Sequence, residues 1–238
     1  MPFSKWIISA TLSIASLAQA SEPLTAFENV YTAKLYGFAI EATSRFQPTS
    51  AEAGTYQYYF NADSMIGSIT ETTNVTWSEK DQTFTPHKYT YLRKGVGKSR
   101  DDELVFDWPN RKVTNTKNNR VLPLEGHSKI QDSLSYQLQL RQDLMAGKTD
   151  LEYSLTNGRK IKKYKFELVG EEKLKTPLGE VQTIKVKRSH VDDNAEVYAW
   201  FAKDFHYLLV RLQQEENGSA YTIYLSKASV NGKAIEHF

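Results

Sequence analysis

The residues whose types and spacing suggest chemistry most directly are Gln137 and Arg141, one helical turn apart in an otherwise apolar stretch. An arginine inside an apolar surface must be paired or must face a polar cavity, because an unpaired buried charge is very costly. Two interpretations remain open. Arg141 is either a structural residue that joins a helix to a sheet, with Asp107 as a candidate partner, or a polar anchor at the base of a ligand cavity.

Asp107 is the second candidate, because it lies between Phe106 and Trp108. Aromatic neighbours can raise the pKa of a carboxyl group, which suits an acid catalyst. A hydrolase of this kind needs a second carboxylate within roughly 5–10 Å in a cleft. Phe106, Trp108 and Trp200 are alternatively candidates to line an apolar ligand cavity, with Arg141, Gln137 and Asp107 as its polar residues.

The chain lacks the residues that other common types of catalytic or metal site require. The chain has no cysteine, which excludes disulfides, thiolate metal sites and a cysteine nucleophile. Its histidines are not spaced as metal ligands on one helix or hairpin, and the nearest approach to a cluster is His190 with Asp192 and Asp193 in a polar loop. We therefore expect no metal and no cofactor, and no residue is identified as catalytic.

The elements that must position these residues are mainly strands, because apolar and polar residues alternate with period two along most of the chain. Asn-Gly pairs at 157–158, 217–218 and 231–232 punctuate the pattern as turn signals. The pattern predicts a mainly β fold, a curved antiparallel meander or a partly closed barrel. Strand alternation is clear at Tyr31–Leu35, Tyr56–Phe60, Leu104–Trp108, Tyr164–Leu168, Val197–Phe201, Leu208–Leu212 and Tyr221–Leu225.

One segment has helical periodicity and predicts a substantial helix packed on the sheet. Ser128 and Gln131 have the spacing of a capping box, and Gly147 can supply the left-handed residue that ends a helix. Between them, at 100° per residue, one broad arc collects the apolar residues Ile130, Leu134, Leu138, Leu140, Leu144 and Met145. Gln137 and Arg141 project into the middle of this arc.

The N-terminus has the pattern of a secretory signal peptide at residues 1–20. Lys5 precedes an apolar stretch from Trp6 to Leu17, and Ala18-Gln19-Ala20 matches the small-x-small cleavage pattern. The stretch is shorter than the ~20 residues that a membrane-spanning helix needs. We expect cleavage after Ala20, a periplasmic location, a single β-rich domain at residues 21–238 and no transmembrane anchor in the mature chain.

The charge balance bears on the choice of partner. The chain has 30 basic and 28 acidic residues, and loss of Lys5 with the signal peptide leaves 29 basic residues against 28. Near-neutrality argues against nucleic acid or an anionic surface as the main partner.

Several segments, taken in order, resemble one family of exported bacterial proteins, the domain of unknown function 3108. The resemblance spans about Phe27 to Tyr224 and implies export and a β-rich fold, but no catalytic residues. The segments that carry it are Phe106-Asp107-Trp108, the helix from Asp132 to Arg141, Thr176-Pro177-Leu178-Gly179, Trp200-Phe201-Ala202 and Leu209-Val210-Arg211.

These observations favour a non-enzymatic binding or carrier protein for an apolar or amphipathic cell-envelope molecule, lipid-like or glycan. A concave β architecture suits such a ligand. The alternatives are an envelope glycan or lipid hydrolase that uses paired carboxylates, and an assembly protein that acts through a sheet edge. The ligand, the oligomeric state and whether the β interior is hollow or packed stay open at this level.

Overall fold

The computed structural model describes residues 24–35, 37–49, 52–95, 98–127, 129–189, 195–216 and 219–238. The segment interpreted as a signal peptide, and the boundary after Ala20, lie outside this described part. In the described residues one curved sheet holds almost all of the chain, with strand order β8-β7-β6-β5-β4-β3-β2-β1-β15-β14-β13-β12-β11-β10-β9.

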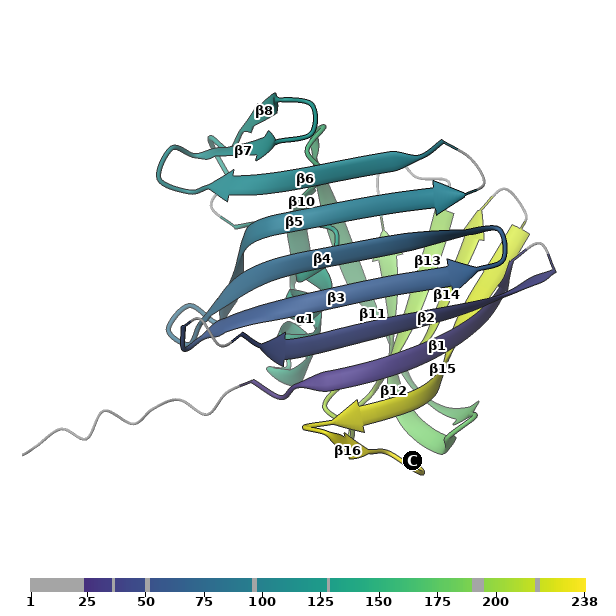
Figure 1. Ribbon diagram of the computed structural model, residues 1–238. Helices are drawn as coiled ribbons and strands as arrows, with labels where there is room; N and C mark the ends of the chain where they lie inside the picture. The colour runs from purple at the N-terminus through teal and green to yellow at the C-terminus, as the bar shows by residue number, and fades with distance from the viewer. Residues whose placement is uncertain are drawn as a thin grey trace, which may run out of the picture.

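The N-terminal half of the sheet is a continuous antiparallel meander (Figure 1). Its strands alternate a buried and a more exposed face, as β3 does with Tyr56 and Tyr58 buried between half-buried neighbours. These strands are β1 (Phe27–Leu35), β2 (Phe38–Pro48), β3 (Thr55–Ser64), β4 (Gly67–Ser78), β5 (Thr83–Gly95), β6 (Arg100–Asp107), β7 (Lys112–Asn115) and β8 (Arg120–Pro123).

The C-terminal half continues the same sheet through the pairing of β15 with β1. Its pairs are antiparallel except for β9 with β10, which is parallel and makes the sheet mixed. The mainly β fold with one helix is confirmed. The elements are β9 (Ile130–Gln131), α1 (Ser135–Met145), β10 (Leu151–Thr156), β11 (Ile161–Thr176), β12 (Gly179–Ser189), β13 (Ala195–Ala202), β14 (Leu208–Glu216), β15 (Ser219–Val230) and β16 (Lys233–Ala234).

Helix α1 begins later than the sequence pattern predicts, because a different capping group starts it. Ile130 and Gln131 form the short strand β9, and Ser128 lies outside the described residues. The Asp132 carboxylate accepts hydrogen bonds from the backbone N–H groups of Leu134 and Ser135, at 2.8 Å each, while the Ser135 hydroxyl accepts one from the Asp132 N–H. Gly147, which follows the C-terminal cap residue Ala146, has φ +70°, as expected.

The helix lies between the two halves of the curved sheet, where it contacts β5 and β10 (Figure 1). Leu134 and Leu138 belong to the larger core, which draws residues from both halves of the sheet, and Leu140 and Leu144 belong to a second core with Phe166 and Val186. Met145 departs from the predicted apolar arc, since it is 41% exposed.

The described strands at the two ends of the sheet, β8 and β9, are not paired with each other, so the sheet is open. Side chains near the helix bridge the opening: Gln131 Nε2 donates to the Phe84 carbonyl at 2.8 Å, and Gln139 Oε1 accepts from the Phe84 N–H at 2.8 Å. No helix in the described part of the chain is long and apolar enough to cross a membrane.

Candidate functional site

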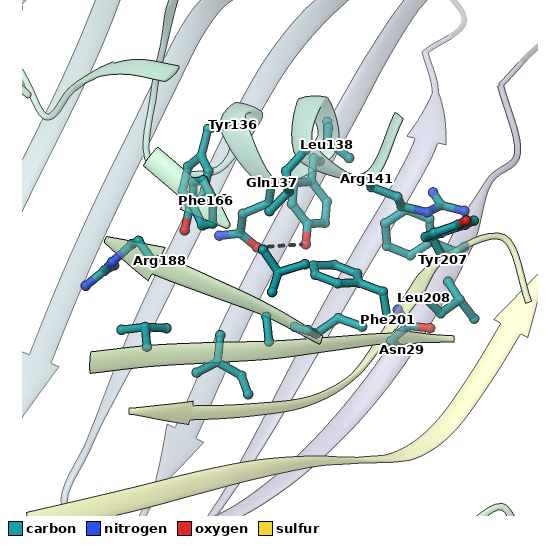
Figure 2. Close-up of a pocket in the computed structure, with 18 of the residues that line it drawn as sticks. Asn29, Tyr136, Gln137, Leu138, Arg141, Phe166, Arg188, Phe201, Tyr207 and Leu208 are labelled. Atoms are coloured by element: carbon teal, nitrogen blue, oxygen red, sulfur yellow. Dashed lines mark hydrogen bonds between the residues drawn. The ribbon is translucent and has the colours of Figure 1, made fainter. Parts of the chain in front are cut away.

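A cavity of about 110 Å³, called here the inner cavity, lies between α1 and the concave face of the sheet (Figure 2). Helix α1 forms one wall, while β1, β3 and strands β11 to β14 form the others. The lining residues are Phe27, Asn29, Tyr31, Tyr58, Tyr136, Gln137, Leu138, Leu140, Arg141, Phe166, Val186, Arg188, Val197, Ala199, Phe201, Tyr207, Leu208, Leu209 and Leu212.

Arg141 is the charged group at one end of this cavity, and it is only 5% exposed. Its Nε donates to the His206 carbonyl at 2.7 Å, and its guanidinium lies over the Phe27 ring, 4.6 Å from the centroid. Its Nη2 has no hydrogen-bond partner among the described residues. Burial lowers the pKa of Arg141 to about 10, so the side chain stays positively charged at neutral pH.

The turn between β13 and β14 presents the carbonyl that Arg141 uses. His206 and Tyr207 both have left-handed backbone angles, φ +51° and +52°, which are unfavourable for residues with a β-carbon. The preceding residue Phe205 packs on Phe238, at 4.7 Å between ring centroids, and this contact helps to hold the turn. The position of Arg141 is therefore fixed by a long-range contact.

Neutral polar groups from β1 and β3 adjoin the guanidinium. The Tyr31 hydroxyl accepts a hydrogen bond from Asn29 Nδ2 at 3.1 Å, and the Tyr58 hydroxyl donates a long one, 3.5 Å, to Gln137 Oε1. Burial raises the pKa of Tyr31 to about 12 and that of Tyr58 further, so both phenols stay neutral. The Asn29 Oδ1 is buried without a partner in the described residues.

The remaining walls are apolar, so the cavity has a polar end and an apolar body. Leu138, Phe201 and Leu208 are buried side chains from three different elements that all face it. Such a site can hold an apolar group and, at the Arg141 end, an anionic or hydrogen-bond-accepting group. The described lining contains no Asp or Glu. The two carboxylates that a hydrolase of this kind needs are therefore not found in this lining.

Two of the residues singled out from sequence, Gln137 and Arg141, meet in the inner cavity (Figure 2). Asp107 does not pair with Arg141, and that suggestion was wrong. Asp107 ends β6, accepts a hydrogen bond from the Asn110 N–H at 3.1 Å, and forms an ion pair with Lys112 at 3.7 Å. The hydrogen bonds from Asn110 lower the pKa of Asp107, opposite to the expected direction.

The three aromatic candidates also lie away from the described lining of the cavity. Phe106 is buried in the larger core and stacks on Trp108, with ring centroids 5.8 Å apart. The Trp108 Nε1 donates to the Pro86 carbonyl. Trp200 points to the opposite face of β13 from Ala199 and Phe201. Its ring lies between Lys185 and Arg211, 4.9 and 4.4 Å from the centroid.

Sequence reasoning missed the contributions of Phe27, Asn29, Tyr31 and Tyr58 to the cavity. Tyr31 and Tyr58 were placed on buried strand faces, and a buried tyrosine needs a partner for its hydroxyl, which is a signal for a polar site. Their proximity to Arg141 depends on the way α1 crosses β1 and β3, and no local pattern encodes that crossing.

Glu71 and Asp132 form a pair of interacting carboxyl groups outside the inner cavity, near the N-terminus of α1. The Tyr89 hydroxyl donates to Glu71, and the Thr73 hydroxyl donates to Asp132 at 2.6 Å. Asp132 is fully buried as the cap of α1, so its role is structural. Within the described residues no group of three or more His, Asp or Glu side chains has the arrangement of a metal site, and His190, Asp192 and Asp193 lie outside them.

The fold and the cavity together define a class: barrel-like β proteins with a partly apolar internal cavity. The chain belongs to the family described as protein of unknown function, DUF3108, whose family model matches residues 31–226. This match confirms the family resemblance inferred from the ordered sequence motifs. The comparison with curated proteins finds no match.

A solved structure shows the same kind of fold at low sequence identity. The beta-barrel-like protein of domain of unknown function DUF1849 from Brucella abortus has a TM-score of 0.60 at 11% identity, over 88% of this chain and 99% of that one. An exported protein with a YmcC-like fold from Bacteroides fragilis matches at a TM-score of 0.32 and 12% identity, over 86% and 94% of the two chains. At 11% identity the likeness to the Brucella abortus protein extends to the fold alone.

Proposed function

We propose that this protein is a non-enzymatic binding or carrier protein for an apolar or amphipathic molecule of the cell envelope, which it holds in the inner cavity. Arg141 is the polar anchor of this site, and α1 is the wall that covers it. The observation that carries the proposal is the Nη2 group of Arg141, buried without a hydrogen-bond partner among the described residues of a mostly apolar lining.

The free-energy cost of burying the unpaired Nη2 group of Arg141 argues for a ligand that accepts its hydrogen bond. A buried hydrogen-bond donor left unsatisfied costs about 1–3 kcal/mol, and more when it is charged. A carboxylate, phosphate or carbonyl oxygen placed beside Nη2 would remove this cost, so the free protein is already organised for an acceptor. Tyr31 and Tyr58, whose hydroxyls remain protonated, support the same chemistry.

The cavity volume limits which part of a ligand fits. An apolar cavity of about 150 Å³ is known to hold one benzene molecule in another protein, and the inner cavity is somewhat smaller, about 110 Å³. A long acyl chain therefore enters only in part, unless α1 shifts outward. We expect the part of such a molecule that does not fit to extend out of the inner cavity.

The alternative functions have less support. The hydrolase hypothesis named Asp107, which lies at the end of β6 with a lowered pKa. The assembly hypothesis needs a long free edge strand. The terminal strands of the described sheet are short, β8 with four residues and β9 with two, and the longer candidate edge is Glu167–Thr176 of β11, which pairs with β12 but not with β10. A periplasmic location with a cleaved signal peptide is part of our proposal and is consistent with an envelope ligand.

The test is native mass spectrometry of the mature protein purified gently from the periplasm, followed by organic extraction of any bound molecule. We expect a reproducible added mass that extracts as lipid. The Arg141→Leu variant should retain about 10- to 100-fold less of it, since a hydrogen bond to a charged group contributes about 1.5–3 kcal/mol. Arg45→Leu, at an exposed ion pair with Glu28, is the matched control and should retain the ligand.

The free energy of unfolding separates a binding arginine from a structural one. A structural arginine is costly to replace, whereas replacing a buried, poorly satisfied charge with an apolar residue is often neutral or stabilising. We expect Arg141→Leu to unfold within about 1 kcal/mol of the wild type, because loss of the bond to the His206 carbonyl offsets the gain from removing an unsatisfied buried charge. A clean apo mass after incubation with envelope lipids, or equal retention by Arg141→Leu, would contradict the proposal.

A further inference from the structure

A second pocket adjoins the inner cavity and has the opposite chemical character. This pocket, called here the vestibule, has a volume of about 200 Å³ and shares Tyr136 and Arg188 with the inner cavity. Its lining also includes Lys160, Lys162, Ser133 and Tyr164. Figure 2 shows Arg188 and Arg141 at opposite ends of the inner cavity, so the vestibule opens from the end remote from Arg141.

The charges of the vestibule are all of one sign in the part of the chain that the structure describes. Its lining there contains three basic residues and no Asp or Glu. Neither Lys160 nor Lys162 forms an ion pair with another described residue, whereas their neighbour Lys163 pairs with Glu152 at 3.0 Å on the other face of the strand. Positive charge is therefore concentrated here in a chain that is close to neutral overall.

Neutral hydrogen-bond donors accompany the cations. Burial raises the pKa of Tyr136 to about 12, so its phenol keeps its proton, and Tyr136 packs against Tyr164 and Phe166. The guanidinium of Arg188 lies over the Tyr164 ring, 4.9 Å from the centroid. Aromatic packing thus holds Tyr136 and Arg188 in place.

The strand β11 connects the two pockets through a graded series of side chains. Residues two apart in a strand point to the same face, so Lys162, Tyr164 and Phe166 form one row. Lys162 lines the vestibule, Phe166 lines the inner cavity, and Tyr164 lies between them in the row. The row changes from cationic to apolar in the direction of the inner cavity, which is the arrangement that an amphipathic anion requires.

We propose that the vestibule is an anion site for a phosphate-type group. The group belongs to an amphipathic ligand whose apolar part lies in the inner cavity and whose acceptor oxygen reaches Arg141 at the far end. The role of the apolar part rests on the function proposed above, whereas the anion site stands on the vestibule alone. Several cations around one pocket favour a phosphate monoester, which carries close to two negative charges, over a single carboxylate.

The test compares probes with the same twelve-carbon tail, dodecyl phosphate and dodecanol, by isothermal titration calorimetry on the mature protein. Substitution of both Lys160 and Lys162 by Gln should weaken the binding of dodecyl phosphate at least about tenfold and leave the affinity for dodecanol within about twofold. The matched control replaces Lys163 and Lys165, which alternate with them and point to the other face of β11, and should bind both probes like the wild type. Added salt should weaken the phosphate probe for the wild type and the control more than for the Lys160/Lys162 variant.

Inorganic phosphate distinguishes the two sources of such an anion. Competition by millimolar phosphate against dodecyl phosphate supports a site that also takes the free ion, and its absence supports a lipid headgroup. Unchanged binding of dodecyl phosphate to the Lys160/Lys162 variant overturns the anion site. If dodecanol and dodecyl phosphate both fail to bind, while inorganic phosphate binds in a Lys160- and Lys162-dependent way, the carrier proposal fails and the anion site stands.

Discussion

Glu71 is a carboxyl group whose surroundings favour its neutral form. Burial on β4 raises its pKa to about 7, and the nearby Asp132 acts in the same direction. The hydrogen bond from the Tyr89 hydroxyl opposes this shift but does not cancel it. A carboxyl that is protonated near neutral pH makes the folded protein sensitive to pH in a predictable direction.

We predict that Glu71→Gln changes the pH dependence of stability. Between about pH 4.5 and 7 the folded protein keeps a proton on Glu71 that the unfolded chain has released, so the stability of the wild type falls as the pH rises through this window. The Gln variant is neutral at every pH. Its free energy of unfolding in urea should equal that of the wild type near pH 5 and exceed it by about 2–3 kcal/mol at pH 8.

Asp132, whose pKa burial also raises, is present in both proteins and does not account for a difference between them. A gap between the two proteins that stays constant from pH 5 to pH 8 would contradict the role assigned to Glu71.

At the scale of elements, α1 replaces a neighbouring strand at the start of β5. Gln139 accepts from the Phe84 N–H at 2.8 Å and donates to the Gln82 carbonyl at 3.0 Å, much as a paired strand would. Gln139 also donates to Asp143, which in turn accepts from the Tyr153 hydroxyl of β10 at 2.8 Å. Side chains of the helix therefore join the two halves of the sheet around the cavity.

Gln139→Ala should consequently cost much more than an ordinary helix substitution. It leaves the buried Phe84 N–H without its partner, and an unsatisfied buried donor costs about 1–3 kcal/mol. We expect a decrease of about 2–4 kcal/mol in the free energy of unfolding, including the lost bond to Gln82. Gln142→Ala is the control, because its side chain has no hydrogen bond with other described residues; equal effects of the two substitutions would show that Gln139 does not dock the helix.

At the scale of the whole molecule, the inner cavity and the vestibule exist because one open sheet curves until its halves face each other. Strands from both halves line the inner cavity, with Tyr31 and Tyr58 on one side and Phe201 and Leu208 on the other. The helix closes the gap that backbone pairing leaves open. A change in the position of α1 would therefore alter the volume available to a ligand.

The proposed location also belongs to this scale. We predict that the protein recovered from the periplasmic fraction begins at Ser21, as determined by N-terminal sequencing. Ile14→Arg, which places a charge in the apolar stretch of the signal peptide, should leave the uncleaved chain in the cytoplasm, whereas Ile14→Leu should be exported normally. Export and processing of the Ile14→Arg chain at the wild-type level would count against the signal peptide.

Local patterns in the sequence were sufficient for the mainly β fold and the single helix. Period-two alternation depends only on which side chains share a face of a strand, and helical periodicity likewise places Gln137 and Arg141 on one face of α1. Alternation also implies that Trp200 faces away from Ala199 and Phe201, so its assignment to the cavity contradicted the pattern itself. The start of the helix was misplaced because the Asp132 carboxylate, and not the predicted Ser128 capping box, accepts the N–H groups at its beginning.

The sequence by itself determined which segments have the apolar periodicity of strands and which has that of a helix. It also determined the family and the presence of an arginine within an apolar helical face. Only the tertiary structure decided that the carbonyl of His206, and not Asp107, holds Arg141, and that Lys160 and Lys162 share a pocket with Arg188. The physical reason is that local periodicity fixes directions within one element, whereas a cavity depends on the curvature of the sheet and the crossing of the helix. Both arise from packing between residues far apart in the chain.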